Sequence, residues 1–103
     1  MRQENKAFNV PYNEIVSLIA DGSYSKIFKK EGDSIFTSKN LGEYEKILPE
    51  EFFRIHKSTI VNLKEVDSLD LKNNSVIMKN GSNYDFSRRK KSALKEALKN
   101  YFS

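Results

Sequence analysis

Short apolar runs separated by turn residues dominate the first third of the chain. The run Ile15–Ala20 is almost continuous and contains β-branched residues, which predicts a strand covered on both faces. Asp21-Gly22 supplies a turn into a second strand over residues 24–28, and Glu31-Gly32-Asp33 supplies a turn into a third over residues 34–37. Three strands joined by tight turns favour an antiparallel meander.

The N-terminal end is less regular. Residues 1–6 are polar and predict a disordered end, and residues 7–10 predict a short strand that Pro11 ends. The length of 103 residues suits one domain, which we place at residues 7–103.

Two helices are predicted from their caps and their apolar spacing. Asn40 is placed to cap the first helix, Glu43 completes a capping box three residues later, and Pro49 marks the end. The apolar stripe of this helix is Leu41, Tyr44, Ile47 and Leu48. Ser87 is predicted to cap a second helix that closes the chain. The buried stripe of that helix is Leu94, Ala97, Leu98 and Tyr101, and its basic face is Arg88, Lys91, Lys95 and Lys99.

A second set of strands lies between the helices. Residues 65–71 and 75–79 predict two strands joined at Asn73-Asn74, and Asn80-Gly81 is a strong hairpin signal before a strand over residues 83–86. The side chains expected to share strand faces are Leu69 with Leu71 and Tyr84 with Phe86. The predicted fold class is therefore mainly β, with antiparallel strands in small packed sheets, one inserted short helix and one C-terminal helix.

Composition narrows the class of protein. Hydrophobic residues make up 38% of the chain, enough for a small core, and the net charge of +4 is typical of an ordinary basic domain. Nucleic acid becomes the expected partner only if the basic residues cluster in space. The absence of cysteine excludes disulfides, thiolate catalysis and zinc–thiolate sites, and is consistent with the cytoplasm. No apolar run is long enough to span a membrane, so no membrane partner is expected.

The segment from Phe52 to Asn62 holds a dense group of polar side chains between apolar ends, including the single histidine, His56. His56 and Ser58 are two residues apart, but a serine hydrolase also needs an orienting carboxylate and an oxyanion site, and neither is visible. One histidine is poor evidence for a metal site. We therefore expect no enzyme activity, no metal and no cofactor.

Basic residues gather in two places. Arg54 and Lys57 flank His56, and a run of four cations over residues 88–91 opens the last helix, where it opposes the helix dipole. An anion such as phosphate offsets that unfavourable charge, although a solvated basic face is the commoner role of such a run. His56 either bonds to neighbouring backbone and shapes the loop, which the apolar Ile55 favours, or contacts a phosphate or a base edge.

The segment Phe52-Phe53-Arg54-Ile55-His56-Lys57-Ser58-Thr59-Ile60-Val61-Asn62 resembles the signature of LytTR-type DNA-binding domains, approximately F-x-R-x-H-[RK]-S-x-x-V-N. The early strand and turn, the internal helix, and Asn80-Gly81 followed by Phe86-Ser87-Arg88 are similar to other parts of that family. The resemblance covers about residues 8 to 100. It implies a mostly β fold that inserts loops into successive major grooves of double-stranded DNA.

The resemblance also implies site residues and partners. The DNA-contacting positions that it places on this chain are Ser25, Lys26, Lys57 and Arg88. His56 and Arg89 are further candidates from their chemistry, His56 as a phosphate or base-edge contact and Arg89 as a contact to the DNA backbone. Arg88 is the best candidate for a base contact, because its planar guanidinium can pair with guanine O6 and N7. Members of the family are usually output domains of bacterial response regulators, which lie downstream of a receiver domain and bind tandem promoter repeats, so a dimer on tandem sites is an expectation.

Two other functions stay open from the residues. Small basic β domains also bind single-stranded RNA or proteins, which requires exposed aromatics such as Tyr24 or Tyr84. A hydrolase that uses Ser58 and His56 has the least support.

Overall fold

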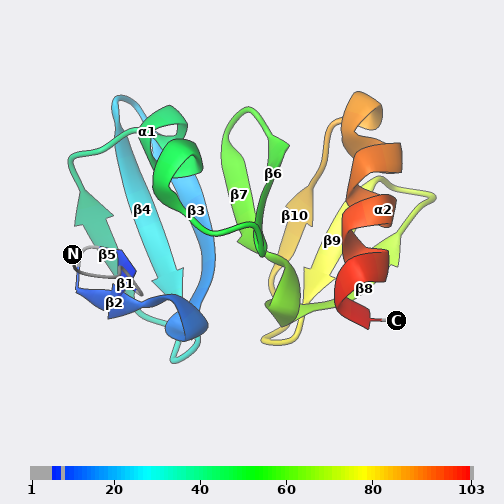
Figure 1. The fold of residues 1–103 in the computed structure, drawn as a ribbon, viewed down its shortest axis with the longest axis horizontal. Helices are drawn as coiled ribbons and strands as arrows, with labels where there is room; N and C mark the ends of the chain where they lie inside the picture. Colours follow the sequence, from blue (N-terminus) through cyan, green and yellow to red (C-terminus); the bar gives the residue numbers. More distant parts are fainter. Residues whose placement is uncertain (1–5, 8, 103) are drawn as a thin grey trace.

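An antiparallel sheet of five strands is the centre of the fold (Figure 1). The structure, a computed structural model, describes residues 6–7 and 9–102. The strand order is β5-β4-β3-β7-β6. The bounds are β3 (Ile15–Asp21), β4 (Tyr24–Lys29), β5 (Ser34–Thr37), β6 (Phe52–His56) and β7 (Thr59–Asn62). The predicted meander is confirmed as β3-β4-β5, and β7 pairs with the free side of β3.

Strand β3 is buried on both faces, as its apolar run predicts. Its first four residues, from Ile15 to Leu18, are all buried. An irregularity in the pairing with β4, between Ile15 and Ser17, shifts the alternation of side chains. As a result Ile15 and Leu18 pack on one side of the sheet, whereas Val16 packs on the other.

Helix α1 (Leu41–Ile47) covers one face of the sheet. The predicted capping box is present, because Asn40 Oδ1 accepts from the Glu43 N–H and Glu43 Oε2 accepts from the Asn40 N–H, both at 2.9 Å. Buried Tyr44 donates its hydroxyl to Thr37 Oγ1 at 2.8 Å. We call the buried cluster on this side the α1 core: Val10, Ile15, Leu18, Ile27, Leu41, Tyr44 and Ile60.

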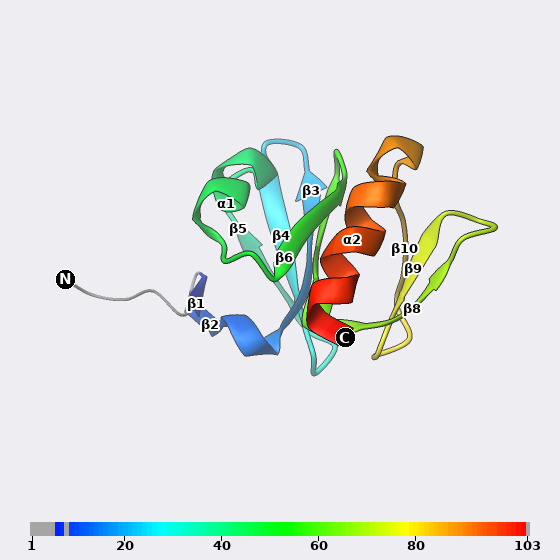
Figure 2. The same ribbon diagram turned by 45° about the vertical axis from the view of Figure 1, so that its right-hand side comes forward.

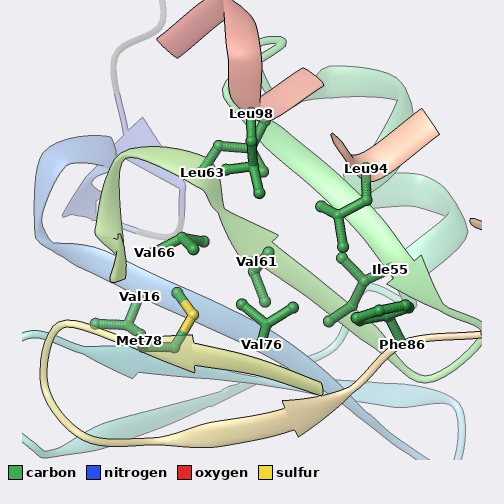
Figure 3. Packing of buried hydrophobic residues seen from close by; sticks show 10 residues of the cluster. All are labelled: Val16, Ile55, Val61, Leu63, Val66, Val76, Met78, Phe86, Leu94 and Leu98. Atoms are coloured by element: carbon green, nitrogen blue, oxygen red, sulfur yellow. The ribbon is translucent and has the colours of Figure 1, made fainter. Parts of the chain in front are cut away.

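A three-stranded sheet and helix α2 pack on the opposite side (Figure 2). The elements are β8 (Val66–Asp70), β9 (Ser75–Met78), β10 (Asn83–Asp85) and α2 (Lys91–Phe102). We call the cluster that they enclose with the large sheet the α2 core (Figure 3): Val16, Ile55, Val61, Leu63, Val66, Val76, Met78, Phe86, Leu94 and Leu98. Single 3₁₀ turns lie at Tyr12–Glu14, Leu63–Glu65 and Arg88–Lys90.

The N-terminal expectations need correction where the structure describes them. The predicted strand over residues 7–10 is two strands, β1 (Lys6–Ala7) and β2 (Val10–Pro11), which pair with each other. Asn9 between them has a φ of 66°, which ends a continuous strand. Lys6 therefore belongs to a strand, and the predicted disorder of residues 1–5 lies outside the described residues.

The β8–β9 turn is held by one carboxylate. Asp70 accepts from Asn73 Nδ2 at 2.8 Å and from the Asn73 N–H at 3.1 Å, and these bonds lower the pKa of Asp70. Asn74 has a φ of 53°, as a tight turn requires. Leu71 was expected to share a face with Leu69, but it lies beyond β8 and is exposed, because the turn begins there.

The last residue of the central segment has a structural role. Asn62 is buried at the end of β7, where Nδ2 donates to the Ile15 carbonyl at 2.9 Å and Oδ1 accepts from the Lys64 N–H at 3.0 Å. We expect Asn62→Ala to lower the free energy of unfolding by about 1–3 kcal/mol, because it leaves buried backbone groups unpaired. Urea denaturation measures the change.

Asn83→Ala is the matched control for this variant. Asn83 is exposed on β10, and its removal should change stability by less than about 0.5 kcal/mol. Equal losses in the two variants would contradict a bonding role for Asn62.

Candidate nucleic-acid interface

Three segments that are distant in sequence lie at the same end of the molecule. They are the β3–β4 turn at Gly22-Ser23, the β6–β7 turn at Lys57-Ser58, and residues 87–90 after β10, all at the top of Figure 1. We call them the tip segments. The Ala20 N–H donates to the Ser58 carbonyl, and the Ser87 N–H donates to the Ile55 carbonyl, each at 2.9 Å. The first bond links β3 to the β6–β7 turn, and the second links the start of residues 87–90 to β6.

The central segment folds as a hairpin instead of a long polar loop. Arg54 of β6 holds the backbone of the β6–β7 turn, because its Nη2 donates to the Lys57 carbonyl at 2.6 Å. Its Nη1 donates to Glu45 Oε1 of α1 at 3.0 Å. With the turn backbone held in this way, the Lys57 side chain is exposed at the tip.

His56 also shapes this turn. Its Nδ1 accepts from the Ser58 N–H at 3.2 Å and lies 2.9 Å from Ser58 Oγ. Because a backbone N–H can only donate, Nδ1 is the acceptor, and the Ser58 hydroxyl is then the donor in the second contact. The interpretation that the histidine bonds to neighbouring backbone is confirmed.

The third tip segment presents arginines on a tethered backbone. Phe86 is buried in the α2 core, while Arg88 and Arg89 are exposed on the 3₁₀ turn that follows. Lys90 is half-buried, with Nζ 5.7 Å from the centroid of the Phe53 ring. The predicted side-chain cap by Ser87 is wrong: its side chain makes no capping bond, because a 3₁₀ turn comes between it and α2.

Ser25 was expected at the DNA-facing surface, and the structure corrects this placement. It is fully buried in β4, and its hydroxyl donates to the Lys39 carbonyl at 2.7 Å. The reason is the strand register, which pairs Ser25 with Thr37 on one side and Ala20 on the other. Ser25 therefore shapes the segment before α1, and its side chain is not at the surface.

Lys26 does not lie with Lys57 and Arg89, because it lines a different pocket. It is half-buried on β4, with Nζ 5.1 Å from the centroid of the Phe36 ring and 5.7 Å from that of Phe28. These distances allow cation–π attraction, which holds the ammonium group over the sheet. Lys26 borders a separate shallow pocket, whose lining includes Phe28 and Tyr84.

A basic hollow of about 340 Å³ lies between the last two tip segments. Its lining residues are Glu45, Arg54, His56, Lys57, Ser87, Arg89 and Lys90. It combines three of the predicted residues, His56, Lys57 and Arg89, whereas Arg88 is exposed beside it. Glu45 was missed by sequence reasoning, because no local signal pairs a helix carboxylate with an arginine nine positions away.

Positive charge characterises this end of the described chain, where Lys57, Arg88 and Arg89 are exposed. Among residues 6–7 and 9–102 there is no group of three or more His, Cys, Asp or Glu side chains placed to hold a metal ion. In the same part of the chain, no helix is both long enough and apolar enough to cross a membrane. The arrangement presents hydrogen-bond donors and positive charge, which suits an anionic partner.

The chain matches known proteins at the level of family and of structure. The family model described as the LytTr DNA-binding domain matches residues 5–99. The fold is similar to that of the LytTr DNA-binding domain of a putative methyl-accepting/DNA response regulator from Bacillus cereus. That likeness has 25% sequence identity and a TM-score of 0.77, and covers 90% of this chain and 92% of the other. No curated protein sequence matches the chain.

Proposed function

Because the chain belongs to the LytTR family of DNA-binding domains, we propose that it binds double-stranded DNA. In this proposal the binding is sequence-specific, and the chain is part of a transcriptional regulator. The observation that carries the proposal is that the tip segments lie at the same end, with Lys57, Arg88 and Arg89 exposed there. Loops that project from one end of a rigid sheet can enter successive major grooves, which are wide enough to admit protein elements.

The exposed cations have different roles in this proposal. Arg88 reads a base edge, because its guanidinium can donate two parallel bonds to guanine O6 and N7. Lys57 meets a phosphate or a guanine as a point charge, and Arg89 and Lys90 hold the DNA backbone. Lys26 is proposed as a flanking contact.

The wider setting is also a proposal. The family and the similar Bacillus cereus domain support a place in a bacterial response regulator, with a receiver domain upstream and a cytoplasmic location. Binding at tandem promoter repeats, with two copies of the domain side by side, is a further part of this proposal. Sequencing the coding region upstream of this segment tests the receiver domain.

Salt dependence tests DNA binding itself. We expect the affinity for a duplex enriched from a random library to fall steeply with salt, with a log–log slope that gains about −0.9 for each phosphate neutralised. The physical reason is that cations such as Lys57 and Arg89 release counterions from the DNA. Fluorescence anisotropy at several salt concentrations measures the slope.

The control is a scrambled duplex of the same length and composition. It should bind more weakly than the enriched duplex and with a similar salt slope, because phosphate contacts do not depend on sequence. A salt-independent affinity, or equal affinity for both duplexes, would contradict sequence-specific DNA binding.

One observation favours a second function, binding of single-stranded RNA or of a protein. Tyr24 and Phe36 are each 54% exposed, the Lys26 ammonium group lies over the Phe36 ring, and exposed aromatics can stack on unpaired bases. Tyr84 is less suited, because it is half-buried and its hydroxyl bonds to Ser17 Oγ at 2.7 Å. Competition between duplex and single-stranded oligonucleotides separates the two functions.

A further inference from the structure

The tautomer of His56 follows from the turn that it supports. Nδ1 accepts from the Ser58 N–H, so the neutral ring carries its hydrogen on Nε2. Nε2 has no hydrogen-bond partner in the part of the chain that the structure describes, and His56 lines the basic hollow. The ring therefore offers one N–H donor, held in place by the bond on its other nitrogen.

The other lining residues add positive charge to this donor. Arg89 and Lys90 come from one side of the hollow and Lys57 from the other, while the one carboxylate, Glu45, is already paired with Arg54 at 3.0 Å. Arg54 Nε is also buried without an acceptor among the described residues. The hollow thus has donors and more cations than its one carboxylate can balance.

We propose that this hollow binds a single backbone phosphate of the DNA duplex, with His56 Nε2–H as a neutral donor and Arg89 and Lys90 as charged partners. The inference rests on the proposed function and deepens it. In this inference the residues of the hollow position the DNA and Arg88 reads a base, because Arg88 does not line the hollow. A phosphate held here fixes the register of the duplex, so that Arg88 meets one base pair.

Single-phosphate replacement in the enriched duplex tests the site. A methylphosphonate removes the charge of one phosphate, and each position is replaced in turn. With the unaltered protein we expect one position to cost about tenfold in affinity, the loss typical of a charged hydrogen bond.

His56→Asn keeps an acceptor near the Nδ1 position but removes the Nε2 donor. Both this variant and Arg89→Gln should bind the unmodified duplex more weakly and lose most of their sensitivity at that same position.

The two variants should differ in their salt slopes. Arg89→Gln removes a charge and should make the slope shallower by about 0.9, whereas His56→Asn removes a neutral donor and should leave the slope unchanged. His56→Gln places an amide N–H near the Nε2 position and should recover part of the affinity. Lys99→Gln, an exposed position on α2 outside the hollow, is the control and should keep full sensitivity at every phosphate.

The outcomes separate the inference from the proposed function. If no duplex can be enriched, the proposed function fails and the phosphate site fails with it. A duplex can bind while each methylphosphonate lowers the affinity of both His56→Asn and Arg89→Gln as much as that of the unaltered protein. In that case the phosphate site alone is overturned. Thermal unfolding of each variant shows whether the protein is folded. If His56→Asn does not fold, Arg89→Gln still tests the site, because Arg89 is exposed and its substitution should not disturb the fold.

Discussion

Phe86→Ala is expected to lower the free energy of unfolding by about 3–5 kcal/mol, as for other buried aromatic truncations. Phe86 is 4% exposed and belongs to the α2 core, where Figure 3 shows it beside Ile55 and below Leu94. Its removal leaves a cavity between β6 and α2 that close-packed neighbours cannot fill completely. Urea denaturation followed by circular dichroism measures the loss.

Phe36→Ala is the control, because it removes the same side chain from a strand where it is 54% exposed. Its cost should be below about 1 kcal/mol, mainly the lost attraction to Lys26. Similar losses in the two variants would show that Phe86 does not anchor the α2 core. Because Phe86 directly precedes Ser87, the variant should also loosen the tip segment that carries Arg88.

Arg88→Ala is expected to weaken binding to the enriched duplex by about 1–3 kcal/mol and to relax specificity at one base position. Arg88 is exposed on the 3₁₀ turn, where its guanidinium is free to enter a groove while the backbone is held by the Ser87 N–H to Ile55 bond. Anisotropy with the enriched duplex and its single-base variants measures both effects. The position where the protein stops discriminating identifies the base that Arg88 reads.

Lys99→Ala is the matched control for this variant. Lys99 is an exposed cation near the C-terminal end of α2, away from the tip segments, so its removal should change affinity little and specificity not at all. If Arg88→Ala instead weakens every duplex by the same factor, Arg88 is a phosphate contact and base reading must come from elsewhere.

The elements that could be predicted from the sequence are those encoded among near neighbours. The capping box of Asn40 and Glu43 spans four positions, and its two reciprocal bonds are present. The hairpin at Asn80-Gly81 likewise depends on a turn in which Gly81 has a φ of 93°. The buried positions Leu94 and Leu98 of α2 follow from helical spacing alone. Each of these elements depends on residues that are close together in the sequence, so a short stretch of sequence is enough to predict it.

The candidate site was less predictable, because its geometry depends on pairing between distant segments. Ser25 looks like a surface residue in a polar stretch, but its register with Thr37 and Ala20 buries it. Lys26 follows it and is held over two phenylalanine rings that come from β4 and β5. The pattern along β4 does not indicate that Ser25 will be covered, since its burial depends on how β4 pairs with its neighbours and on the segment before α1.

The sequence by itself determined that this chain forms antiparallel strands with two helices and carries a LytTR-type segment from Phe52 to Asn62. Local turn, capping and spacing preferences are sufficient for the strands and helices, whereas the LytTR-type segment is identified by its resemblance to the family signature. Only the tertiary structure decided that His56, Lys57 and Arg89 line one hollow, that Arg54 divides its bonds between Lys57 and Glu45, and that Ser25 is excluded from the surface. These outcomes depend on the register of the central sheet and on packing in the α2 core, which bring together residues that no local preference connects.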